Sequence, residues 1–164
     1  MAHACKIRPY RPHRDTPAIL RLIRSELAPL SRVPIGREAL TDRALAARIR
    51  RGRTLVAAGR NGKVLGFIHF MFMAAKPPLA PAWLHIDLLA VEPESRGRGI
   101  GSALLAEAEA YGRSRRCASA VLFVDDGNDR AHRFYLRAGY RTVRYWPSLR
   151  CRELWKPLVP ALSG

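Results

Sequence analysis

Apolar side chains follow two spacings along the chain, and each switch between them predicts a change of element. Short apolar runs, and runs in which apolar and polar residues alternate, indicate β-strands. These runs are residues 5–10, 54–59, 63–74, 83–91, 119–124, 140–146 and 151–157. Apolar residues three or four positions apart indicate amphipathic helices instead. These lie around an apolar stripe at 19–27, within 37–52, and at 99–116 and 128–138.

Cap and turn residues mark where several elements begin or end. Asp15 or Thr16 can cap the first helix because their side-chain oxygens accept backbone N–H groups, and Pro17 suits its first turn. Gly52 ends the second helix. The sequence "RNGK" at 60–63 predicts a tight turn that joins the strands on either side into a β-hairpin.

Proline-containing segments separate the remaining elements. Residues 28–36 form a loop, and residues 76–81 form a rigid connector. The strand at 83–91 is mostly apolar, which is typical of a strand covered on both faces. The resulting order, β-α-α-β-β-β-α-β-α-β-β, predicts one domain of the mixed α/β class, and 164 residues are enough to bury a sizeable core.

The chain is strongly basic, with 29 Lys and Arg against 13 Asp and Glu, a formal charge of +16. Such a charge favours polyanionic partners, either nucleic acid or a phosphorylated small molecule. The alternative, which we favour, is a solvated arginine-rich surface. The densest run, residues 48–53, falls where a helix should end, and cations are stabilising at that end of the helix dipole.

Cysteine usage and hydropathy exclude several classes of protein. The chain has three cysteines, Cys5, Cys117 and Cys151. Their number is odd and they include no C-x-x-C pair, which disfavours a disulfide framework and a structural zinc site. The five histidines also lack a metal-binding spacing, so no metal is expected. The longest apolar run, 64–75, contains His69 and is too short to span a bilayer. The sequence therefore predicts a soluble cytoplasmic protein.

The stretch "SRGRGIGSALL" at 95–105 places three glycines between a predicted strand and a predicted helix. Glycines at 97, 99 and 101 leave the backbone amides uncovered where the helix begins, and these amides and the helix dipole together bind anions such as phosphate. Ser102 stands where a dinucleotide-binding fingerprint needs another glycine, and the Gly-Lys-Ser/Thr of a P-loop is missing.

The spacing Arg96-x-x-Gly99-x-Gly101 resembles the pyrophosphate-binding motif of the GCN5-related N-acetyltransferases (GNAT), which bind acetyl-coenzyme A. Two separate stretches carry the resemblance, which is strong over residues 84–142. The first contains Val91, Pro93, Ile100, Leu104 and Leu105. The second, "NDRAHRFYLRAGY", contains Asn128, Ala131, Phe134, Tyr135, Gly139 and Tyr140. The chain is identified as a member of this family because both motifs agree with the order of elements.

The resemblance implies a fold and a cosubstrate. We expect a single GNAT domain over 1–164, with a mixed, mostly antiparallel central sheet and flanking helices. Acetyl-CoA would lie between a splayed parallel pair of strands, 83–91 and 119–124, and no metal would be needed. The implied cofactor-binding residues are Leu89, Ala90, Val91, Arg96, Gly97, Arg98, Gly99, Ile100, Gly101, Ser102, Asn128, Ala131 and Tyr135.

Some of these residues have a second interpretation. Asn128 can bind the pantetheine arm of the cofactor or cap the helix that follows it, and the two roles are compatible. Arg130, Arg133 and Arg137 recur on one helical face, where they can reach the 3′-phosphate or face solvent, and we favour solvent.

The resemblance also implies catalytic residues. Tyr135 occupies the family position of the general acid that protonates the leaving thiolate. Asp87 and His85 alternate along one strand and so project from the same sheet face. Each matches the position of a carboxylate used as a base by some relatives. Their structural alternatives are an arginine partner for Asp87 and a buried hydrogen bond for His85, so the base stays open.

The predicted function is transfer of an acetyl group from acetyl-CoA to a primary amine by direct attack in a ternary complex. The acceptor is either a small-molecule amine or a protein amine, and its pocket should lie between residues 28–40 and 145–151. The positive charge disfavours polyamines. The alternative is a catalytically weak CoA-binding module that docks on RNA or ribosomes. The resemblance allows a homodimer, although no sequence feature indicates one.

Overall fold

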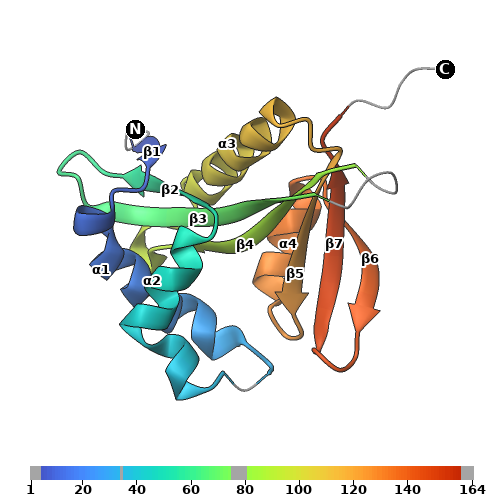
Figure 1. Ribbon diagram of the computed structural model, residues 1–164, viewed down its shortest axis with the longest axis horizontal. Helices are drawn as coiled ribbons and strands as arrows, with labels where there is room; N and C mark the ends of the chain where they lie inside the picture. Colours follow the sequence, from blue (N-terminus) through green and yellow to red (C-terminus); the bar gives the residue numbers. More distant parts are fainter. Residues whose placement is uncertain (1–4, 34, 75–80, 160–164) are drawn as a thin grey trace.

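The computed structural model describes residues 5–33, 35–74 and 81–159. One seven-stranded sheet crosses the molecule in the order β1-β2-β3-β4-β5-β7-β6 (Figure 1). Its strands are β1 (Lys6–Pro9), β2 (Arg53–Ala58), β3 (Val64–Met73), β4 (Trp83–Val91), β5 (Ser119–Asp125), β6 (Arg141–Trp146) and β7 (Cys151–Pro157). The helices are α1 (Pro12–Leu22), α2 (Asp42–Arg50), α3 (Ile100–Ser114) and α4 (Asp129–Arg137). The predicted mixed α/β class and order of strands and helices are confirmed.

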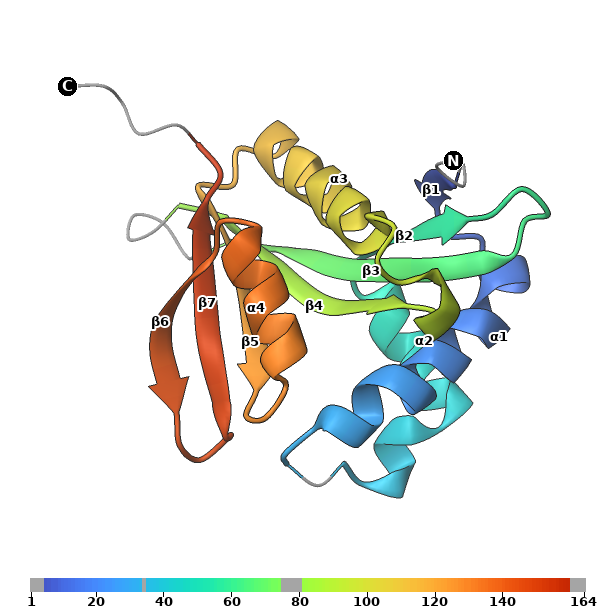
Figure 2. The same ribbon diagram turned by 180° about the vertical axis from the view of Figure 1, so that it is seen from behind.

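The helices cover opposite faces of the sheet and create two hydrophobic cores (Figures 1 and 2). Helices α1 and α2 pack on one face, where their Ile19 and Leu45 belong to the same core as Phe67 of β3. Helices α3 and α4 pack on the other face, where Leu104 and Tyr135 meet the apolar side of β4, β5 and β7. Among the described residues, no helix is both long and apolar enough to cross a membrane.

The parallel pair at the centre of the sheet is short. Strands β4 and β5 pair in parallel only from Trp83↔Ser119 to His85↔Val121, whereas every other pairing in the sheet is antiparallel. Beyond His85, β4 continues to Val91 but no longer pairs with β5. The splayed parallel pair predicted from the resemblance is therefore present.

A β-bulge in β4 reverses which side chains face each core. The pairing with β3 passes from Ile86↔Phe70 to Leu88↔His69, so Asp87 is the extra residue. Before the bulge, Ile86 packs in the core under α3; after it, Leu88 packs against the core under α1 and α2. The alternation of side chains between the two faces of the sheet is therefore interrupted at Asp87. No pattern in the sequence indicated this interruption.

The predicted start of the first helix is wrong. Helix α1 begins at Pro12, with Arg11 at the N-cap, and Pro17 lies inside it. Asp15 is not the N-cap residue but lies buried in the first turn of the helix, where its carboxylate accepts hydrogen bonds from Arg8 at 2.7 and 2.8 Å and from the Arg11 N–H at 2.7 Å. These contacts stabilise the turn that precedes the predicted cap.

The predicted second helix is divided in two. A 3₁₀ turn, η3 (Arg37–Leu40), comes first, and α2 begins only after Thr41, whose hydroxyl accepts the Ala44 N–H at 3.3 Å. The predicted loop at 28–36 begins with another 3₁₀ turn, η2 (Ala28–Leu30), which follows a π-helical turn, η1 (Ile23–Leu27). Apart from its last residue, the connector predicted at 76–81 lies outside the described residues.

Candidate active site

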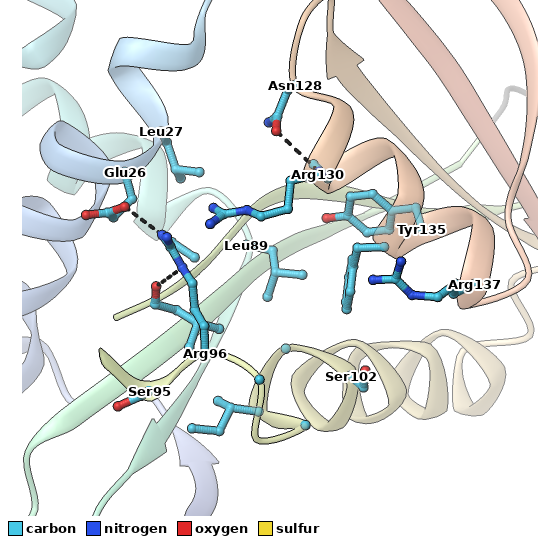
Figure 3. Close-up of a pocket in the computed structure, with 18 of the residues that line it drawn as sticks. Glu26, Leu27, Leu89, Ser95, Arg96, Ser102, Asn128, Arg130, Tyr135 and Arg137 are labelled. Carbon is cyan, nitrogen blue, oxygen red and sulfur yellow. Dashed lines mark hydrogen bonds and ion pairs between the residues drawn. The ribbon is translucent and has the colours of Figure 1, made fainter. Parts of the chain in front are cut away.

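A cavity of about 330 Å³ lies between β4, the beginning of α3 and one side of α4 (Figure 3). Its floor is the turn that enters α3, and its walls come from η1, β4 and α4. The lining contains most of the predicted cofactor-binding residues: Leu89, Ala90, Val91, Arg96, Gly97, Gly99, Ile100, Gly101, Ser102, Asn128, Ala131 and Tyr135. We call this space the cofactor cavity.

The turn that enters α3 requires glycine at two positions. Gly97 and Gly99 have φ of +74° and +76°, in the left-handed region that side chains disfavour. Gly99 is the N-cap of α3, and no side chain caps the helix there. The first amides of α3 therefore lack an intrahelical partner where the helix dipole is positive. This conformation is compatible with the predicted phosphate site, which remains a prediction.

Arg96 and Arg98 do not both face the cavity. The Arg96 guanidinium lies 2.6 Å from the Glu26 carboxylate and donates to the Val91 carbonyl at 3.2 Å, so its charge is already paired (Figure 3). Arg98 is exposed and is not part of the lining. A role for either side chain at a phosphate remains a prediction.

Two other arginines line the cavity from α4. Arg130 and Arg137 lie seven positions apart, which places them on one side of the helix, and both are drawn at the cavity in Figure 3. Arg133, the third arginine considered with them, is not part of the lining. No ion pair involves Arg130 or Arg137 within the described parts of the chain. Two arginine side chains without an ion pair to a described residue therefore line the cavity.

Asn128 caps α4, because its side-chain oxygen accepts the Ala131 N–H at 3.3 Å. The helix-capping role considered for Asn128 from the sequence is therefore present. The amide NH₂ group still has donors for a ligand in the cofactor cavity, which Asn128 also lines. The predicted contact with the pantetheine arm remains a prediction.

A second cavity, also of about 330 Å³, lies on the other side of the opening between β4 and β5. It is lined by both strands, by the η1–η2 segment and by Ile35. Six residues belong to both cavities: Leu27, Leu30, Leu89, Asn128, Ala131 and Tyr135. We call the second space the acceptor chamber. The two spaces meet where the parallel strands separate.

Tyr135 stands at this junction. Its ring packs edge-on against Phe134, with ring centroids 5.0 Å apart, and against Tyr140 at 5.5 Å. Burial raises the pKa of the phenol well above its ordinary value, so the group is protonated at neutral pH. Tyr135 is thus packed in the core and also lines both cavities, while its role as the general acid remains a prediction.

Asp87 and His85 both line the acceptor chamber. Both carboxylate oxygens of Asp87 accept hydrogen bonds from Arg48, at 2.7 and 2.9 Å, so the arginine partner considered for it is present. His85 Nε2 lies 3.9 Å from Asp87 Oδ1. Burial lowers the pKa of His85, with a further lowering by Arg48 and an opposite effect of Asp87. His85 is therefore neutral at pH 7 and able to accept a proton.

His69 of β3 joins this group and was missed by the sequence analysis. It is fully buried, its Nδ1 lies 2.9 Å from Thr54 Oγ1, and its Nε2 lies 3.8 Å from Asp87 Oδ2. Among the described residues, this Nε2 is the only buried side-chain nitrogen or oxygen that has no hydrogen-bond partner. Pairing of β3 with β4 brings His69 to Asp87, and the bulge hides that register from the sequence.

The described ranges contain no group of three or more His, Cys, Asp or Glu residues arranged to hold a metal ion. Burial also raises the pKa of the Cys117 and Cys151 thiols, which makes these thiols poor nucleophiles.

Residues 20–140 match the Acetyltransferase (GNAT) family. The chain belongs to this family. Blasticidin-S acetyltransferase of Streptomyces morookaense is 45% identical over 66 residues, which cover 40% of this chain and 47% of that protein. Aminoalkylphosphonate N-acetyltransferase of Salmonella typhimurium is 40% identical over 89 residues, which cover 52% and 55%. The matches thus span about half the length of these curated GNAT relatives.

A solved GNAT structure extends the comparison to the whole fold. The PaiA N-acetyltransferase of Thermoplasma acidophilum in complex with coenzyme A has a TM-score of 0.77. It is 19% identical, and the match covers 94% of this chain and 99% of the other. The sheet with its splayed parallel pair is therefore the GNAT fold, as predicted.

Proposed function

We propose that this protein is an acetyl-CoA-dependent N-acetyltransferase that acts on a primary amine. The observation that carries the proposal is the position of Tyr135, a buried phenol at the junction of two cavities. One cavity has an anion-binding turn, and the other has a neutral imidazole beside a carboxylate. This arrangement provides for the three needs of acyl transfer, which are a cofactor site, a general acid and a general base.

The cofactor cavity fits a ligand with a phosphate at one end and a thioester at the other. The amides at the start of α3 would bind the pyrophosphate, with Arg130 and Arg137 as charged partners. Asn128 would donate to the pantetheine arm. The acetyl carbonyl would accept a backbone N–H from the segment of β4 beyond its pairing with β5, at Leu89, Ala90 or Val91.

Bound acetyl-CoA supplies the acetyl group as a thioester, whose carbonyl carbon the amine nitrogen attacks while the carbon–sulfur bond breaks. Tyr135 would give its proton to the departing thiolate, because burial keeps the phenol protonated. The nitrogen loses two protons overall, one of which replaces the proton that Tyr135 gave. The other passes to His85 and from there to solvent.

His85 is the better candidate for the general base. Arg48 occupies both oxygens of Asp87, whereas the His85 side chain is 20% exposed to the chamber. Asp87 would instead position His85 and stabilise the imidazolium that forms when the amine gives up its proton. Arg48 in turn holds Asp87 in place through the two hydrogen bonds.

The test is amine-dependent release of coenzyme A thiol, with the acetylated amine identified by mass spectrometry. Tyr135→Phe should lower kcat about 10²-fold without a matching change in coenzyme A affinity, because it removes only the proton donor. Tyr145→Phe is the matched control, since its exposed hydroxyl bonds Asp126 and lines neither cavity. Full turnover by Tyr135→Phe would contradict the assignment of the acid, and no release with any amine would contradict the proposed function.

A further inference from the structure

The mouth of the acceptor chamber is bordered by exposed apolar side chains. Phe123 of β5 is 45% exposed, and Ile35, before η3, is 40% exposed. Both line the chamber, where the apolar side chains of Leu27, Leu30 and Leu88 lie among polar ones that include Arg48 and Asp125. Large apolar side chains left in water at a concave site are typical of a ligand-binding surface.

Phe123 is held in this position by the strand and not by the core. Its neighbours Leu122 and Val124 point to the other face of β5 and are buried under α4. The Phe123 ring lies 6.0 Å from the ring of His85, centroid to centroid. An aromatic group packed on Phe123 would therefore lie beside the proposed base.

The charges of the chamber differ from those of the whole molecule. The chain carries +16, but in the chamber Arg48 and Asp87 neutralise each other through their paired hydrogen bonds. Asp125, at the end of β5, also lines the chamber, and within the described residues it forms no ion pair. One carboxylate therefore remains to attract one cation, while the surrounding positive surface repels polycations.

We propose that the acceptor is a small primary monoamine with an aromatic or other apolar body. Its ammonium group would enter toward His85 under the attraction of Asp125, and its body would pack between Ile35 and Phe123. The volume of about 330 Å³ is in the range of small-molecule pockets. This inference rests on the proposed acetyltransferase function and names the acceptor of the same site.

The experiment compares kcat/KM for four amines: 2-phenylethylamine, propylamine, ethanolamine and spermidine. Phenylethylamine should exceed propylamine and ethanolamine by at least about tenfold, since buried apolar groups change specificity by this order, and spermidine should be the poorest acceptor. Phe123→Ala should raise KM for phenylethylamine about tenfold and leave KM for propylamine nearly unchanged. Asp125→Asn should raise KM for all three monoamines.

Val143→Ala is the matched control for Phe123→Ala, because Val143 is 48% exposed on β6 and lines neither cavity. Coenzyme A affinity, measured for each variant, verifies that the fold and the cofactor cavity are intact. Equal kcat/KM for phenylethylamine and ethanolamine, or equal effects of Phe123→Ala and Val143→Ala, would overturn the proposed acceptor class alone. Absence of transfer to every amine would overturn the proposed function itself.

Discussion

Asp87 and His85 illustrate how neighbouring side chains decide the role of a residue. Both lie on one strand and line one chamber, and the sequence left open which of them is the base. The structure pairs Asp87 with Arg48, a residue 39 positions earlier in the chain, and leaves His85 neutral and partly accessible. The division of roles that we propose for them thus depends on α2, which supplies Arg48.

His85→Gln should lower kcat/KM at pH 7 by about 10²-fold or more, because no group then takes the proton of the ammonium. The wild-type rate should reach its plateau near neutral pH, because burial keeps the pKa of His85 below its usual 6.5. The rate of the variant should continue to rise as the free amine itself deprotonates at about pH 10. A pH profile of kcat/KM measures both.

His132→Gln is the control for this substitution, because His132 lies on α4, bonds Thr142 and lines neither cavity. It should reproduce the wild-type profile. A His85→Gln profile equal to that of the wild type would exclude His85 as the base.

At the scale of elements, the turn before α3 is the part of the site that the backbone alone defines. Gly99→Ala should cost about 1–2 kcal/mol of unfolding free energy, because φ of +76° is strained for any side chain. It should also weaken coenzyme A binding, since the strained turn reorients the amides that face the cavity. Chemical denaturation and titration calorimetry measure the two effects.

Gly36→Ala provides the comparison, because Gly36 has φ of −60° and its added Cβ would meet no atom within 4 Å. It should change the unfolding free energy by less than about 0.5 kcal/mol. Equal effects of the two substitutions would show that the left-handed conformation at Gly99 is not required.

The sequence predicted the elements well because apolar spacing reports which side chains face a core. It failed where distant contacts decide the local structure. Helix α1 starts early because Asp15 bonds Arg8 of β1, and the bulge at Asp87 breaks the alternation of β4. The insertion of β7 between β5 and β6 also had no local signal.

The same distinction between local patterns and distant contacts applies to the candidate site. The motif glycines and Tyr135 could be found from the sequence because they lie within two short, characteristic stretches. The Arg48–Asp87 pair and the approach of His69 to Asp87 join segments far apart in the chain. Residues that act through such pairs cannot be found from the spacing of a single sequence.

At the scale of the whole molecule, acid should destabilise the fold in two steps. Burial lowers the pKa of His69 and of His85 below 6.5. Below about pH 6.5 these two histidines therefore bind more protons in the unfolded chain than in the folded chain, which lowers the free energy of unfolding. Burial alone would raise the pKa of Asp15, but hydrogen bonds from Arg8 and Arg11 lower it below 3.8, so its contribution is lost only in stronger acid. Stability should thus fall between pH 7 and pH 5, and again below about pH 4.

Thermal unfolding across this pH range measures the first step. His69→Gln should flatten the fall of Tm between pH 7 and pH 5, because it removes one of the two imidazoles whose pKa is lowered in the fold. His132→Gln should keep the wild-type slope. The same slope in all three proteins would contradict a folded-state effect of His69.

The central claim is that the cofactor cavity binds the phosphate-bearing cosubstrate of acyl transfer. Titration calorimetry of the full chain with coenzyme A, at two salt concentrations, tests this claim most directly. We predict one site per chain with a micromolar Kd that weakens as salt screens the phosphate contacts. No binding at millimolar coenzyme A would contradict the claim, and tight RNA binding with a steep salt dependence would then favour the docking module.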